Sequence, residues 1–122
     1  METMQEHSNV KVDYGEFVLG ALIMESRRHL TQMRSMLLPE VFRNKKQRVI
    51  FEVMCEMQDN GIDIDLVTLN REIRKREEGK DITPDYLSSL TDRVSSTANS
   101  KSHARVLIEK HLGNEVLRMT RK

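Results

Sequence analysis

Carboxylate side chains form the cluster in this sequence that most invites metal chemistry. Asp59, Asp63 and Asp65 are spaced closely enough to suggest a calcium-binding loop. A twelve-residue loop that begins at Asp59 would, however, place Ile64 where the sharp turn needs glycine, and Asn70 where the bidentate glutamate belongs. The cluster therefore fails as a calcium site, and we expect Asp65 to cap a helix instead.

Residue types that could provide catalysis or bind a nucleotide are also present, but their spacing does not fit. Cys55 has no histidine near it and lies in a segment whose apolar spacing indicates burial, so we expect an inert thiol. His103 and His111 are eight residues apart, and no third zinc ligand accompanies them. Asp81 follows the Gly-Lys pair at residues 79–80, where a phosphate-binding loop requires Ser or Thr. We predict no catalytic residues, no metal and no cofactor in this chain.

Length and composition describe the scaffold that would hold these residues. The chain has 122 residues, enough for one hydrophobic core. Its net charge of +1 provides no overall attraction to nucleic acid or to an anionic membrane. The longest apolar run, residues 17–24, is too short to span a bilayer. A single cysteine fits a reducing compartment, so we expect a cytoplasmic protein.

Charge is unevenly divided between the two ends. Residues 1–26 contain five acidic residues and one lysine, whereas residues 101–122 contain six basic residues and two acidic ones. Opposite charge at the two ends could draw them to each other or to a partner.

Caps and stops along the sequence predict helices throughout. We expect helices over residues 13–26, 28–38, 44–60 and 65–76, a fifth from residue 84, and a long last helix from about residue 98 to the end. The expected N-caps are Asp13, Asn44, Asp65 and Thr83. We find no strand-like alternation of useful length and no internal repeat. The predicted fold class is all-α.

The last helix carries an apolar stripe that could contact another chain. Ile108, Leu112, Val116 and Met119 recur at helical spacing, with Leu107 beside them. An unpaired apolar face of this length is typical of an interface.

Basic residues leave a second class of function open. They form three groups, around residues 45–46, 71–76 and 118–122, and acidic residues are interleaved with the first two. Solvated helix faces are the simpler interpretation, because nucleic-acid binding usually requires a denser basic stripe or aromatic platforms. A stand-alone helical DNA-binding or regulatory protein remains the alternative.

The order of short motifs resembles a known family. The motifs that carry the resemblance are Glu16-Phe-Val-Leu-Gly-Ala-Leu-Ile23, Leu38-Pro-Glu-Val-Phe42, Arg48-Val-Ile-Phe-Glu52, Gly61-Ile-Asp-Ile-Asp-Leu-Val-Thr-Leu69, Tyr86-Leu87, Ala98-Asn99 and His103-Ala-Arg-Val106. Together they resemble the amino-terminal domain of the bacterial replicative DNA helicase DnaB, over about residues 13–122. Gln47, His103 and the segment 81–84 depart from the family pattern. These departures indicate a divergent member.

The resemblance implies a division of the chain into three parts. Residues 1–12 would be a flexible segment, and residues 13–97 a compact helical head of about five helices. Residues 98–122 would form the first arm of a helical hairpin, with the second arm beyond residue 122. ATP and magnesium would bind only in a motor domain that also lies beyond this chain.

The resemblance also implies a function in DNA replication without catalysis. The family's domain pairs with neighbouring copies, as dimers and then as a hexamer, to form a collar that receives the primase. A helicase loader is a further implied partner, and no membrane and little direct nucleic-acid contact are expected. Tyr86 and Leu117 match the primase-facing surface, although Tyr86 could equally be a half-buried aromatic of the head. The predicted contact residues are Tyr86, Leu107, Ile108, Leu112, Val116, Leu117 and Met119.

Overall fold

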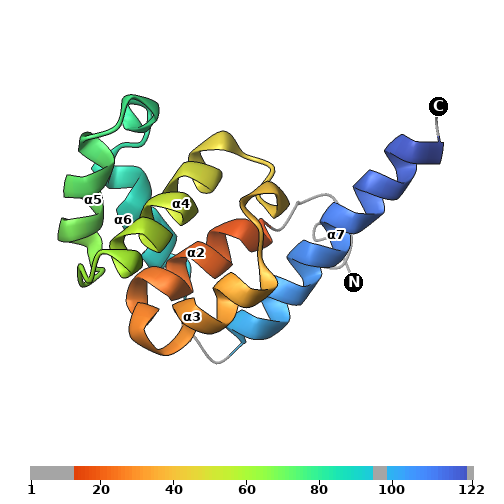
Figure 1. Ribbon diagram of the computed structural model, residues 1–122, viewed down its shortest axis with the longest axis horizontal. Coiled ribbons are helices and arrows are strands. Elements are labelled where there is room, and N and C mark those ends of the chain that lie inside the picture. The colour runs from red at the N-terminus through yellow and green to blue at the C-terminus, as the bar shows by residue number, and fades with distance from the viewer. Residues whose placement is uncertain (1–12, 95–98, 121–122) are drawn as a thin grey trace, which may run out of the picture.

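The computed structural model describes residues 13–94 and 99–120, and all of its regular elements are helical (Figure 1). The all-α prediction is therefore confirmed over these residues, with five α-helices in the head and one long helix after them. The predicted flexible segment 1–12 lies outside the described residues. The elements run α2 (Tyr14–Met24), α3 (Ser26–Met36), η1 (Pro39–Val41), α4 (Lys45–Asp59), α5 (Leu66–Arg74), η2 (Glu77–Gly79), α6 (Pro84–Asp92) and α7 (Ser100–Thr120).

Local hydrogen bonds explain where four of these helices begin. The carboxylate of Asp13 and the side-chain oxygens of Asn44 and Thr83 each accept a hydrogen bond from a backbone N–H in the first helical turn. Asp65 forms a reciprocal capping box with Thr68, whose backbone N–H donates to the Asp65 carboxylate over 2.8 Å. All four caps predicted from the sequence are confirmed.

Helix ends differ from the prediction by a few residues. Gly61, with φ of +70°, provides a left-handed turn after α4. Helix α5 stops at Arg74, two residues earlier than expected, and the chain then forms the short helix η2. Gly79 packs so closely on Ile73 that a Cβ there would lie 2.3 Å from the Ile73 carbonyl oxygen. This close approach folds the end of η2 back onto α5.

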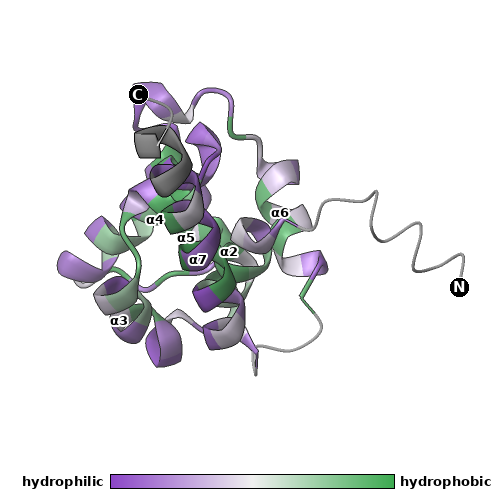
Figure 2. Cartoon of the chain, turned by 90° about the vertical axis from the view of Figure 1, so that its right-hand side faces the viewer, coloured by the Kyte–Doolittle hydropathy of each residue, from purple (hydrophilic) through white to green (hydrophobic). Residues whose placement is uncertain are grey.

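Helix α2 lies at the centre of the molecule. It packs against α3, α4, α6 and α7, and most of its side chains are buried. In Figure 2 the hydrophobic residues gather along α2 and α4, whereas hydrophilic residues lie on the outer helices. Phe42, which follows η1, and Phe51 on α4 pack with ring centroids 5.3 Å apart, and Met33, Met54 and Met57 are also buried in the core.

The contact between α2 and α6 predicts how the fold responds to one added methyl group. A Cβ at Gly20 would lie 2.2 Å from the carbonyl oxygen of Leu90, which is backbone of α6. We expect Gly20→Ala to lower the free energy of unfolding by about 1–3 kcal/mol, because the two helices must move apart. Gly113→Ala is the matched control, since nothing lies within 4 Å of the added Cβ, and it should stabilise by about 0.5–1 kcal/mol. Urea unfolding of both variants tests this, and equal effects would contradict the close packing.

The capping box predicts a dependence of stability on pH. Hydrogen bonds from Thr68 lower the pKa of the Asp65 carboxyl below its usual value. This contribution to stability is therefore complete above the unfolded-state pKa of about 4 and is lost as the pH falls through the lower folded-state pKa. Asp65→Asn keeps a good N-cap but removes the charge. The stability difference between wild type and Asp65→Asn should shrink between about pH 6 and about pH 3 in thermal unfolding. Parallel curves would refute this assignment.

Candidate functional site

Helix α7 has two halves with different surroundings. In the first half Ser100, Ala104 and Leu107 are buried, and Ile108 packs partly against the core. One turn later Leu112 is 57% exposed. Figure 1 shows the second half of α7 extending away from the other helices. We call this second half, residues 109–120, the α7 tip.

The predicted exposed stripe requires one correction. Leu107 is 8% exposed, because α2, α3 and η1 pack against the first half of α7. Its side chain therefore belongs to the core of this chain and is not offered to a partner. Ile108 is half-buried, and Leu112 is accessible. The packing also continues across the expected boundary at residue 98, since residues 100–108 join the head.

Three of the predicted contact residues lie further along the same helix. The backbone of α7 is helical to Thr120. The side chains of Val116, Leu117 and Met119 fall outside the part of the chain whose side chains are described. Their contribution to self-association stays a prediction.

Tyr86 lies on α6, which packs mainly on α2 and α5 rather than on the α7 tip. Its ring is half-buried, and burial raises the pKa of the Tyr86 hydroxyl. The ammonium group of Lys46 lies 5.4 Å from the ring centroid, as in a cation–π contact. Among the described residues the Tyr86 hydroxyl has no hydrogen-bond partner of good geometry. The structure thus does not bring Tyr86 together with Leu112.

Each member of the acidic cluster has a structural partner. Asp59 accepts a hydrogen bond from Arg34 over 2.8 Å, which lowers the pKa of the Asp59 carboxyl. Asp63 pairs with Arg27 over 3.2 Å, and Asp65 caps α5. Within residues 13–94 and 99–120 no group of three His, Cys, Asp or Glu side chains could hold a metal ion.

Cys55 and His103 are residue types that could take part in catalysis, but both make packing contacts. Cys55 is half-buried, and burial raises the pKa of its thiol, which disfavours the reactive thiolate. His103 lies against Tyr14 and Phe17, with ring centroids 5.7 Å and 5.4 Å away. This aromatic contact fastens α7 to the start of α2.

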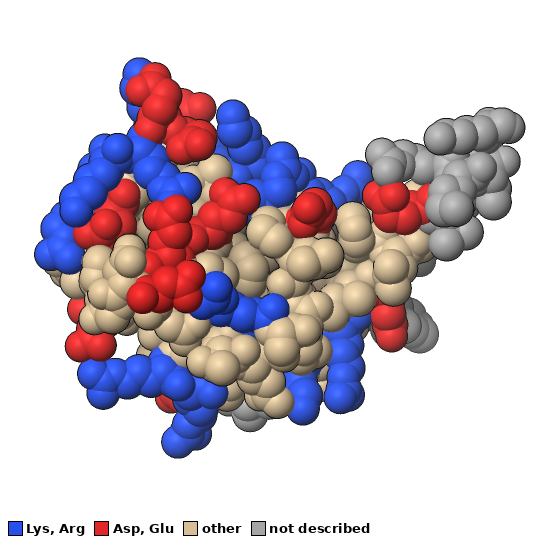
Figure 3. Space-filling model, viewed as in Figure 1, with Lys and Arg blue, Asp and Glu red and all other residues tan. Residues whose placement is uncertain are grey.

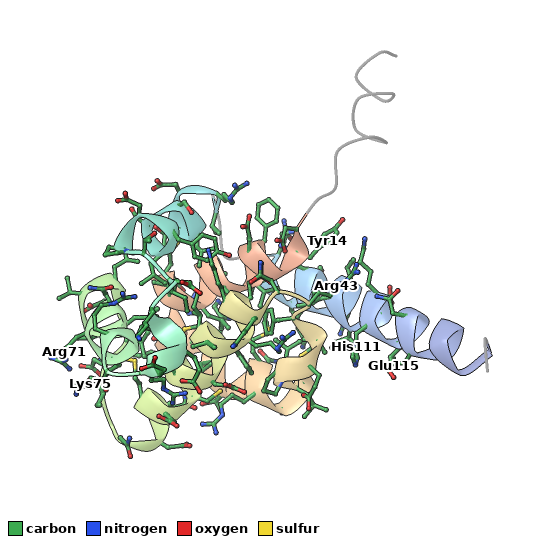
Figure 4. All side chains as sticks on the ribbon, turned by 90° about the horizontal axis from the view of Figure 1, so that it is seen from above. Tyr14, Arg43, Arg71, Lys75, His111 and Glu115 are labelled. Carbon is green, nitrogen blue, oxygen red and sulfur yellow. The ribbon has the colours of Figure 1, made fainter. Side chains whose placement is uncertain are left out.

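Basic residues of α5 are largely paired within the chain. Arg71 and Lys75 both contact the Glu72 carboxylate, and Arg74 donates to the carbonyl oxygens of Gly79 and Ile82. Figure 4 shows Arg71 on α5 and Lys75 just after it, both on the outside and at the opposite end of the molecule from His111 and Glu115 on α7. On the face in Figure 3 blue and red side chains alternate, so the charges form no continuous basic stripe there.

An apolar groove lies where α2, α5 and α6 meet, and the sequence did not predict it. Its volume is about 540 Å³, and we call it the Val67 groove. Val67 is 78% exposed and Met24 is 48% exposed. One signal was visible in the sequence, because Val67 falls outside the buried spacing of Leu66, Leu69 and Ile73. The groove is lined by Ile23, Met24, Asp65, Leu66, Val67 and Thr91.

No helix in the described part of the chain is both long enough and apolar enough to cross a membrane.

Two known proteins that are similar to this chain are both replicative DNA helicases. The chain is 33% identical to the replicative DNA helicase DnaB of Rhodothermus marinus over 112 residues, which are 89% of this chain and 12% of that protein. It is 32% identical to replicative DNA helicase DnaB of Geobacillus stearothermophilus over 108 residues, 88% of this chain and 24% of that protein. The chain thus spans a quarter or less of these two relatives.

A solved structure matches the fold. The crystal structure of the N-terminal domain of DnaB helicase from Mycobacterium tuberculosis superposes with a TM-score of 0.81 at 21% identity. The match covers 88% of this chain and 77% of the other. Residues 7–109 also match the family model described as the DnaB-like helicase N terminal domain. Because that match takes in most of the sequence, this chain belongs to the DnaB-like helicase N terminal domain family.

Proposed function

We propose that this chain is a non-catalytic domain of a replicative helicase, which self-associates into a collar and docks a primase during DNA replication. Membership of the family supports the link to replication. The observation that carries self-association is Leu112, a large apolar side chain that is 57% exposed on the α7 tip. Dimers, and a hexamer in the full-length protein, are the expected assemblies.

The α7 tip has a physical reason to seek a partner. Most helical stability in proteins comes from packing of an apolar face, and the turns around Leu112 have little of it. The first half of α7 is held by the head, but the tip extends beyond it (Figure 1). Contact with another copy would both cover Leu112 and stabilise the helical turns around it.

Tyr86 supports a second contact surface on the head. A half-buried tyrosine ring with a lysine ammonium beside it combines apolar area with charge, a combination that is common at protein interfaces. Because Tyr86 and Leu112 lie on different parts of the molecule, primase docking at Tyr86 would be compatible with self-association at the tip. A helicase loader is a further candidate for the head.

The proposal places the chemistry elsewhere in the helicase. Asp59, Asp63 and Cys55 all make structural contacts, which supports a non-catalytic domain. ATP and magnesium would be bound by a motor domain elsewhere in the full-length helicase. The lone cysteine fits a cytoplasmic setting.

The alternative function, a stand-alone DNA-binding or regulatory protein, has less support. It would depend on the arginines of α5 and on the basic residues near the end of the chain. Arg71 and Lys75 are already paired with Glu72, and unpairing them would offset part of any gain from phosphate contacts. A DNA affinity that falls steeply as salt increases would favour this alternative.

Self-association can be tested with a single substitution at the tip. We expect the average mass of the wild-type chain to increase with concentration in size-exclusion chromatography with light scattering. Leu112→Glu should weaken this association by about tenfold or more, because a buried carboxylate without a partner is costly.

Leu38→Glu is the matched control, since Leu38 is 66% exposed on the head and lies on neither the tip nor the Val67 groove. This control should associate like the wild type. A wild-type chain that stays monomeric at every concentration would contradict the proposed self-association.

Primase docking needs a separate measurement. A primase C-terminal domain should bind the chain in isothermal titration calorimetry, and Tyr86→Ala should weaken this binding by about tenfold. Tyr86→Phe should bind like the wild type, because the hydroxyl makes no hydrogen bond of good geometry within the described residues. Comparing thermal unfolding of both variants separates lost contact from lost folding. If Tyr86→Ala binds the primase domain as tightly as the wild type does, Tyr86 is not part of the docking surface.

A further inference from the structure

A small cavity lies where the end of α6 meets the start of α7, and the proposed function gives it no role. Its volume is about 90 Å³, and we call it the α6–α7 cavity. A water molecule takes about 30 Å³ in the liquid, and pockets for drug-sized ligands begin at about 300 Å³. The cavity therefore has room for one small ion or group. Phe17 and Ala21 of α2 form an apolar wall. The polar residues that line it are Arg93, Asn99, Ser100 and His103.

The start of α7 presents backbone N–H groups that its own helix cannot use. The N–H of His103 donates to the carbonyl oxygen of Asn99 over 3.0 Å, so the N–H groups of residues 100–102 precede the helical ladder. Within the described residues no side chain caps this turn, and the turn contains no acidic residue. The positive end of a 21-residue helix thus lacks a negative partner there, and an anion would provide one.

A buried hydroxyl is an independent sign of a ligand in the α6–α7 cavity. Ser100 is only 3% exposed, and it lines the cavity. In the part of the chain that the structure describes, its side chain makes no hydrogen bond. Burial of a hydroxyl without a partner is costly. An oxygen atom of a bound group would accept the missing hydrogen bond.

Arg93 brings a positive charge to the same cavity. It directly follows α6, and its Nε lies 3.0 Å from the carboxylate of Glu16. No other partner of Arg93 occurs among residues 13–94 and 99–120, so its terminal nitrogens are available. A guanidinium group matches the oxygen atoms of phosphate. Because Glu16 offsets part of the charge, we expect a dissociation constant of about 1 mM.

We propose that the α6–α7 cavity binds one phosphate group. The Ser100 hydroxyl and the first N–H groups of α7 donate hydrogen bonds to its oxygen atoms, and Arg93 provides the opposite charge. No glycine-rich loop takes part, so the site is unlike the phosphate-binding loop that the sequence excludes. Inorganic phosphate and the terminal phosphate of a nucleotide share this chemistry. In the second case the sugar and base would stay outside the cavity.

Titration with inorganic phosphate, followed by amide chemical shifts in NMR spectra, tests the proposal. We expect saturable shifts for the amides of residues 100–102. The temperature of thermal unfolding should also increase with phosphate concentration, because the ligand binds only the folded chain. Sodium chloride at the same ionic strength is the reference. An equal response to chloride would indicate an adventitious ion only, and the absence of any saturable response would overturn the proposal.

A pair of serine variants tests the hydroxyl. Ser100→Ala should weaken phosphate binding by about threefold or more, because one hydrogen bond to a charged group is lost. Ser102→Ala is the matched control, since Ser102 lies in the same turn but is exposed and does not line the cavity. It should bind phosphate like the wild type. Equal affinities for the two variants would place the ion outside the cavity.

A second pair separates the charge of Arg93 from its ion pair. Arg93→Gln should weaken phosphate binding by about tenfold. This substitution also breaks the contact with Glu16. Glu16→Gln breaks the same contact but keeps the guanidinium group and removes a nearby negative charge. It should therefore bind phosphate at least as tightly as the wild type. Equal loss of binding in both variants would contradict a direct role of the guanidinium group.

Adenosine monophosphate distinguishes the two sources of the phosphate group. Affinity equal to or higher than that of inorganic phosphate would assign the group to a nucleotide. If adenosine monophosphate does not displace inorganic phosphate, the ligand is the free ion. Neither result depends on self-association or on primase docking, so failure of this inference would leave the proposed function intact.

Discussion

Burial of α2 is the interaction on which the rest of the structure depends. Four other helices pack against it, and its small residue Gly20 lets the backbone of α6 approach closely. Hydrophobic burial is the main favourable term in folding, so a central helix that is covered on most sides fixes the positions of its neighbours. Contacts with α2 position the Val67 groove, Tyr86 and the start of α7.

The first turns of α7 contribute to the fold, and its last turns carry the proposed function. Ala104 and Leu107 complete the core, and His103 packs on the aromatic rings at the start of α2. The same helix then carries Leu112 away from the head. Because the first half is anchored by packing, the direction of the tip is set by the core. A docking element on an anchored helix loses less conformational entropy on binding than a free one would.

Local features of the sequence predicted most of the fold. The caps at Asp13, Asn44, Asp65 and Thr83 depend on side chains and backbone groups within three residues, so spacing alone identifies them. The candidate site was harder to predict. Leu107 shares an apolar stripe with Leu112, and only the packing of α2 against α7 decides which turn is covered. The Val67 groove combines three helices distant in sequence, so no periodicity within one helix could show it.

We propose that contact with another copy of this chain stabilises the helical turns of the α7 tip. Hydrogen exchange measured by mass spectrometry at low and high protein concentration tests it most directly. We expect exchange in residues 109–120 to slow as concentration increases, while exchange in α4, which is already packed in the head, stays the same. Exchange in the tip that does not change with concentration would show that the tip makes no contact with another copy.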